Sequence, residues 1–101
     1  PLTVESRRQI LRFFAMLPGM AEYSFPKNKI RIVLFETIHP ASVDALKSAG
    51  YSVELIPKAL EGEELTRAVA DAHVIGVRSR TKIRKEQIAA AKRLLCIGCF
   101  S

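Results

Sequence analysis

The 101-residue chain contains no tryptophan, only two cysteines and five scattered glycines. These glycines form neither the G-x-G-x-x-G turn that binds dinucleotides nor a P-loop, so the chain carries no cofactor-binding motif of its own. Two cysteines cannot build the disulfide framework of a small secreted domain, which favours a reducing compartment, and we expect the cytoplasm. No apolar run approaches the ~20 residues that span a membrane, and no signal-peptide pattern is present. We therefore expect no membrane partner.

Negative charge is also in short supply, because ten acidic residues face sixteen lysines and arginines, for a net charge of +6. This excess favours an anionic partner without choosing among a nucleotide, a sugar phosphate and RNA. Several cations crowd into one short segment, namely Arg78, Arg80, Lys82, Arg84 and Lys85. Proteins that bind single-stranded nucleic acid usually add aromatic side chains on which bases stack, and this segment has none. We expect no nucleic acid, and a nucleic-acid binder remains the least favoured alternative.

Short apolar runs alternate with amphipathic segments from residue 29 onward. Strands are expected over residues 29–35, 51–56, 74–77 and 95–98. Helices are expected over residues 40–49 and 85–93, the latter with Ile88, Ala91 and either Leu94 or Leu95 facing inward, and a third helix opens over residues 60–64. This alternation predicts an α/β fold, a flavodoxin-like parallel sheet of order 2-1-3-4 with helices on both faces.

The first 28 residues differ from the rest and are expected to form a helical extension and a linker. Apolar side chains recur at helical spacing over residues 3–17, and Pro18-Gly19 ends the pattern. Such a helix packs on its own domain or on a neighbouring subunit, or it lies on a membrane surface or acts as a targeting segment. Because the chain starts at Pro1, we also expect processing or truncation upstream.

Arg78-Ser79-Arg80-Thr81 directly follows the apolar run of residues 74–77. Two guanidiniums and two hydroxyls can hold a planar or tetrahedral anion, and an extended backbone would place Arg78 and Arg80 on one face. Alternatively, these are solvated arginines at the end of a strand. In the order 2-1-3-4, ligands bind where the order reverses, between the first and third strands. Residues 36–39 and 78–81 would then surround one crevice, which supports anion binding.

Histidines and cysteines offer weaker candidates. His73 stands at the entrance of a strand and is expected to be structural, whereas His39 either touches a ligand or serves the start of a helix. Cys96 and Cys99 lie along a strand without further ligands at metal-binding spacing, so we expect buried, inert thiols and no metal.

Several short runs keep the order and spacing of a known family: Ala49-Gly50-Tyr51, Ala70-Asp71-Ala72-His73, Ile75-Gly76-Val77-Arg78-Ser79-Arg80-Thr81 and Ile97-Gly98-Cys99-Phe100. From about residue 25 to its end, the chain resembles the amino-terminal part of the D-isomer-specific 2-hydroxyacid dehydrogenases, in the subgroup that carries Arg-Ser-Arg-Thr. The resemblance implies an oxidoreductase that uses NAD to oxidise 3-phosphoglycerate to 3-phosphohydroxypyruvate in serine biosynthesis, as a homo-oligomer. Arg78 and Ser79 match positions that hold substrate, and Arg80 matches the second arginine of the subgroup.

The resemblance also implies that residues 29–101 are the first, larger segment of a substrate-binding domain, which is incomplete here. The nucleotide-binding domain, the catalytic residues and the NAD site would lie outside this chain, so the fragment alone is expected to be inactive. The chain departs from the family at Arg84, where a capping hydroxyl is usual, and at Glu61-Gly62, where aspartate is common. Each departure would weaken a helix start by up to ~1 kcal/mol. The alternative is a stand-alone, non-catalytic module that binds a small phosphorylated acid.

Overall fold

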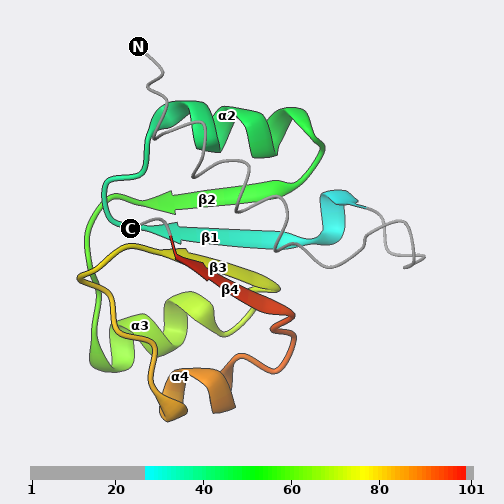
Figure 1. Ribbon diagram of the computed structural model, residues 1–101. Coiled ribbons are helices and arrows are strands. Elements are labelled where there is room, and N and C mark those ends of the chain that lie inside the picture. The colour runs from blue at the N-terminus through cyan, green and yellow to red at the C-terminus, as the bar shows by residue number, and fades with distance from the viewer. Residues whose placement is uncertain (1–26, 100–101) are drawn as a thin grey trace.

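Parallel strands form the centre of the computed structural model, which describes residues 27–99 (Figure 1). The strands are β1 (Arg31–Phe35), β2 (Ser52–Ile56), β3 (Val74–Val77) and β4 (Cys96–Cys99). They pair in parallel in the order β2-β1-β3-β4, which confirms the order expected from the sequence. The expected helix over residues 3–17 lies outside the described residues.

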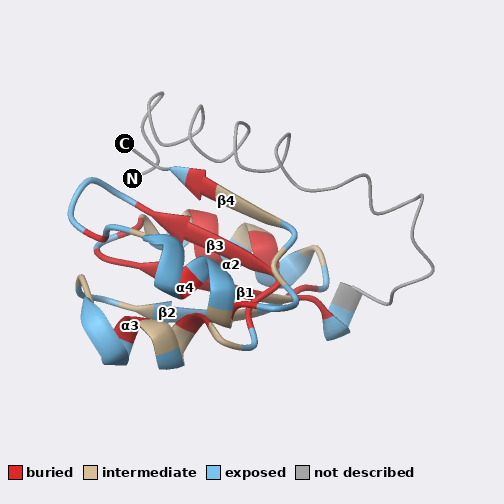
Figure 2. Ribbon diagram, turned by 90° about the horizontal axis from the view of Figure 1, so that it is seen from below, coloured by how far each residue is buried: buried red, intermediate tan, exposed pale blue. Residues whose placement is uncertain are grey.

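Helices cover both faces of this sheet, as expected. Helix α2 (Pro40–Ser48) lies on one face, and α3 (Gly62–Val69) and α4 (Lys85–Ala90) lie on the other, while a 3-10 turn, η2 (Lys27–Lys29), precedes β1 (Figure 1). Because side chains alternate along β1, Ile32 and Leu34 join the core under α2, whereas Val33 and Phe35 join the core under α3 and α4. Strands β1 and β3 are therefore buried on both faces, and the edge strand β2 is largely exposed (Figure 2).

Residues 36–39 connect the end of β1 to helix α2. His39 is its N-cap, with the Nδ1 atom accepting a hydrogen bond of 3.0 Å from the backbone N–H of Ala41. Pro40 occupies the first turn, where its missing N–H costs nothing. Gly50 follows the helix with a φ of 102°, a left-handed conformation that glycine adopts without steric cost. The structure thus gives His39 the role of starting a helix.

Helix α4 is shorter than expected, and it is rotated about its own axis so that a different face points toward the core. It ends at Ala90, not at residue 93, because the chain must turn there for the N–H groups of Leu95 and Cys96 to reach the His73 carbonyl. Gln87 is buried instead of Ile88, which is 51% exposed. The Gln87 side chain explains this: its Oε1 accepts from the Arg84 N–H (2.8 Å) and its Nε2 donates to Thr66 of α3 (3.1 Å).

The inward-facing residues around the end of α4 are Ala91, which is 4% exposed, and Leu94, which packs on the same core, while Leu95 is 45% exposed. The N-cap residues of α3 and α4 offer no side-chain cap, as their sequence indicates. Glu61 makes no capping side-chain hydrogen bond at α3, and the side chain of Arg84, which has only donors, makes none at α4.

His73 joins three strands at the start of β3. Its backbone N–H donates to the Arg31 carbonyl (2.9 Å), its Nδ1 accepts from the Arg31 N–H (3.0 Å), and its carbonyl accepts from Leu95 and Cys96 at the start of β4. The expected structural role is therefore confirmed. Burial, together with the positive charge of Arg93, lowers the pKa of His73.

This lowered pKa predicts a loss of stability in mild acid. Since the unfolded histidine has a pKa of about 6.5, its contribution is complete above that pH and falls as the pH drops toward the lower folded pKa. Asparagine can place its Oδ1 near the position of Nδ1 without titrating. We expect the urea midpoint of the chain to fall between pH 7 and pH 5, and to fall less in His73→Asn. Parallel curves for the two proteins would contradict the assignment, because all other titrating groups are shared.

Candidate functional site

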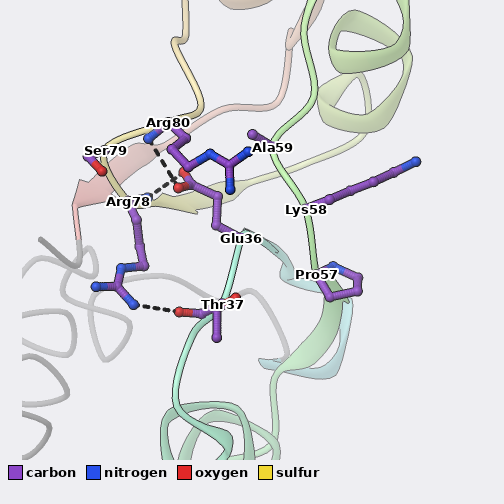
Figure 3. A pocket seen from close by; sticks show the side chains of 8 residues that line it. All are labelled: Glu36, Thr37, Pro57, Lys58, Ala59, Arg78, Ser79 and Arg80. Atoms are coloured by element: carbon purple, nitrogen blue, oxygen red, sulfur yellow. Dashed lines mark hydrogen bonds between the residues drawn. The ribbon is translucent and has the colours of Figure 1, made fainter.

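A hollow of about 220 Å³ opens where the chain leaves the carboxyl ends of β1, β2 and β3 (Figure 3). Its lining comes from the segments that follow these strands, namely Glu36, Thr37, Pro57, Lys58, Ala59, Arg78, Ser79 and Arg80. Parallel strands bring their carboxyl ends to the same edge of the sheet, and the order reverses between β1 and β3. The crevice therefore lies at the switch point that the sequence indicates.

Three of the expected anion-binding residues line this hollow, and two neighbours do not. Arg78, Ser79 and Arg80 are exposed at its rim. Thr81 is 3% exposed and lies behind them, so its hydroxyl is not part of the lining. His39 is occupied at the start of α2. The structure thus brings the two arginines and the serine together and leaves the second hydroxyl and the histidine outside.

The extended backbone that would place Arg78 and Arg80 on one face is not what the structure shows. The chain bends at Ser79 and Arg80, so strand alternation does not decide where the arginines point. The Arg78 Nη1 atom donates to the Thr37 carbonyl at 2.7 Å, whereas the Arg80 guanidinium lies on the other side of Glu36, near Ala59 (Figure 3). The two guanidiniums flank one hollow from different directions.

Glu36 is the centre of this arrangement, and sequence reasoning placed it at the crevice without giving it a role. Its side chain is 5% exposed, and its carboxylate accepts hydrogen bonds from the backbone N–H groups of Arg78 (3.0 Å), Arg80 (3.1 Å) and Thr81 (2.9 Å). Burial alone would raise the pKa of Glu36, but the hydrogen bonds outweigh it and lower the pKa below its ordinary value. Glu36 is therefore ionised at neutral pH.

The backbone of Glu36 is as unusual as its side chain. Its φ of 73° is the only positive value found at a non-glycine residue among residues 27–99. Such a conformation costs a bulky residue of order 1 kcal/mol or more, and it persists where surrounding contacts hold it. The sequence signal for Glu36 is an acidic residue that stands between the apolar run of residues 32–35 and a turn.

The positive charges at the hollow form no ion pair within the described residues. In the part of the chain that the structure describes, the ion pairs are Arg31–Glu54 and Arg67–Glu63, and neither involves Arg78, Arg80 or Lys58. Lys58, which sequence reasoning also missed, lines the hollow while its ammonium points outward (Figure 3). The chemistry that this site can perform is the binding of an anion by charge-assisted hydrogen bonds.

Metal binding finds no support in the described residues, where no cluster of three or more His, Cys, Asp or Glu side chains could hold an ion. Cys96 is half-buried, and burial raises the pKa of its thiol, but Cys99 is exposed, which corrects the expectation that both are buried. Within the described residues, no helix is long and apolar enough to cross a bilayer.

Comparison with known proteins places these residues in a wider context. Residues 32–101 match the family model described as D-isomer specific 2-hydroxyacid dehydrogenase, catalytic domain. The chain is 47% identical over 78 residues to a protein of Haemophilus influenzae, covering 76% of this chain and 19% of that protein. It is 44% identical over 77 residues to a protein of Dictyostelium discoideum, covering 76% and 19%. A protein of Escherichia coli K12 is 43% identical over 82 residues, covering 80% and 20%.

All three relatives are named D-3-phosphoglycerate dehydrogenase. The chain spans about a fifth of the length of these curated relatives.

Proposed function

The chain belongs to the D-isomer-specific 2-hydroxyacid dehydrogenase family, and on that basis we propose that it forms the first segment of a substrate-binding domain. The complete enzyme would oxidise 3-phosphoglycerate to 3-phosphohydroxypyruvate with NAD, supplying serine biosynthesis. The names of the three relatives support this substrate. We further propose that the protein forms a homo-oligomer, since β4 is an outer strand in the described part of the sheet and can pair with another chain. We also propose that it acts in the cytoplasm.

The observation that carries the proposal is the pair of guanidiniums around one hollow. 3-Phosphoglycerate has an anionic group at each end, a carboxylate and a phosphate. Arg78 and Arg80 approach the hollow from either side of Glu36, which suits a molecule with two separated negative groups better than a single small anion. The Ser79 hydroxyl lies between them in sequence and can donate to either group. The role of this segment is to bind and orient substrate.

The residues present do not fit NAD. The turn between β1 and α2 contains no glycine, and the start of α2 is already capped by His39 and occupied by Pro40, which has no N–H to offer a pyrophosphate. We therefore assign no cofactor contact and no chemical step to residues 27–99. In the complete enzyme, NAD and the groups that remove the hydride and the proton would belong to other segments.

Titration of the isolated chain with 3-phosphoglycerate, followed by NMR, tests the proposal. We expect the backbone amides of Thr37, Ser79 and Arg80 to shift, because the cations at the hollow form no ion pair within the described residues. NAD should leave these amides unchanged, because the start of α2 offers its pyrophosphate no N–H site. Lactate, which lacks the phosphate, is the matched control and should bind more weakly. Shifts confined to other regions, or none, would refute the proposed site. Turnover by the complete protein with NAD separates an enzyme from a stand-alone binding module.

A further inference from the structure

The carboxylate of Glu36 lies beside the hollow, yet its hydrogen bonds go to the main chain of the opposite loop. We propose that Glu36 is a positioning residue for the anion site, because it holds residues 78–81 in the bent shape that presents Arg78 and Arg80 to a ligand. This inference rests on the proposed function and deepens it. Glu36 would act through the arginines and would not itself touch the substrate.

The convergence of donors shows why an acid is needed here. The N–H groups of Arg78 and Thr81 both point at Oε2, and that of Arg80 points at Oε1. A carboxylate can accept at both oxygens, whereas the amide of a glutamine has one acceptor and one donor group. In Glu36→Gln, at least one of the three N–H groups would face an NH₂ group. The variant would therefore lose at least one hydrogen bond to the loop, while the side chain at position 36 keeps its size.

A second contact fixes the same loop from its other side. The Arg78 guanidinium donates to the carbonyl of Thr37, the residue next to Glu36, at 2.7 Å (Figure 3). Glu36 has a left-handed backbone, and it follows β1, the strand that pairs with β3. Arg78 is therefore held through its main chain and its side chain together, so that a change at position 36 is transmitted to its guanidinium.

Because Glu36 is negatively charged, the inference can be tested by whether its neutralisation strengthens or weakens binding of the anion. A negative charge beside an anion site opposes binding, so that its removal would strengthen binding if electrostatics alone acted. Positioning predicts the opposite, since the arginines would no longer be held where the anion needs them. Glu36→Gln should therefore weaken binding although it makes the site more positive. A merely electrostatic role cannot produce that result.

The experiment measures affinity and loop order in the same protein. Binding of 3-phosphoglycerate to the full chain is followed by NMR, and hydrogen exchange is measured at the amides of Arg78, Arg80 and Thr81. In Glu36→Gln we expect about tenfold weaker binding and faster exchange at these amides, with the β1 and β3 amides still protected. Glu64→Gln, the same chemical change at an exposed site on α3, should alter neither quantity.

The outcomes separate this inference from the proposed function. No binding by the unchanged chain would refute the proposed function and the inference with it. Binding that is equal or tighter in Glu36→Gln would overturn the inference alone. If that variant loses protection throughout the sheet, Glu36→Asp, which keeps the charge on a shorter arm, decides instead. In Glu36→Asp, affinity and protection of the three amides must be kept or lost together, and a loss of one without the other would overturn the inference.

Discussion

Replacing Arg78 or Arg80 by alanine in the complete enzyme should raise the KM for 3-phosphoglycerate by about tenfold or more, and replacing both by about a hundredfold. Each guanidinium offers charge-assisted hydrogen bonds to one end of a doubly anionic substrate, and neither is engaged in an ion pair within residues 27–99. The KM for NAD should stay within twofold or so, since no described residue fits the cofactor. Steady-state kinetics with each substrate varied in turn makes the measurement.

Two control variants make this result specific to the site. Arg67→Ala removes the same charge from α3, where Arg67 is 78% exposed and pairs with Glu63, and should leave both KM values unchanged. Arg80→Lys keeps the charge but loses the planar fork, so its KM should fall between that of the parent and that of Arg80→Ala. An unchanged KM for 3-phosphoglycerate in both Arg78→Ala and Arg80→Ala would reject the substrate-binding role.

Truncating Phe35 should have the largest effect on stability. Its side chain is fully buried at the end of β1, in the core under α3 and α4, and Phe→Ala changes at such sites cost about 3–5 kcal/mol. A domain of this size is stable by only about 5–15 kcal/mol, so Phe35→Ala should remove much of the free energy of unfolding. Urea denaturation followed by far-UV circular dichroism measures the loss.

Leu55→Ala is the matched control for that experiment. Leu55 lies on the edge strand β2 and is 38% exposed, so truncation should cost no more than about 1 kcal/mol. A similar drop in the urea midpoint for both variants would mean that Phe35 does not carry the core under α3 and α4 as described. Since Phe35 directly precedes Glu36, its loss should also loosen the hollow.

The sheet could be derived from the sequence because its signals are local. Pro40 and Gly50 mark the two ends of a helix, and Pro57 marks the end of a strand, each within a few residues of the observed bounds. The right-handed crossover rule then limits the strand order. The same topology predicts that residues 36–39 and 78–81 meet at one edge of the sheet, and five of these residues (36, 37 and 78–80) line the hollow there. For these elements, local pattern and global fold agree.

The errors concern interactions between distant residues. Ile88 was expected inside from its helical spacing, yet a pair of hydrogen bonds made by Gln87 turned the helix the other way. The bend of residues 78–81 is imposed by Glu36, more than 40 residues earlier in the chain, and no periodicity reports such a contact. Long-range polar contacts of this kind lie beyond single-sequence reasoning.

Because Glu36 accepts hydrogen bonds from main-chain N–H groups, these three bonds do not depend on which side chains the loop carries. A library that keeps Arg78, whose side chain donates to the Thr37 carbonyl, and randomises positions 79 and 80 can therefore explore new ligand preferences on the same loop. Proline must be omitted at position 80, whose N–H group is used, but it is chemically allowed at position 79, whose N–H the carboxylate leaves alone. Such separation of framework from specificity makes this loop a convenient starting point for directed evolution.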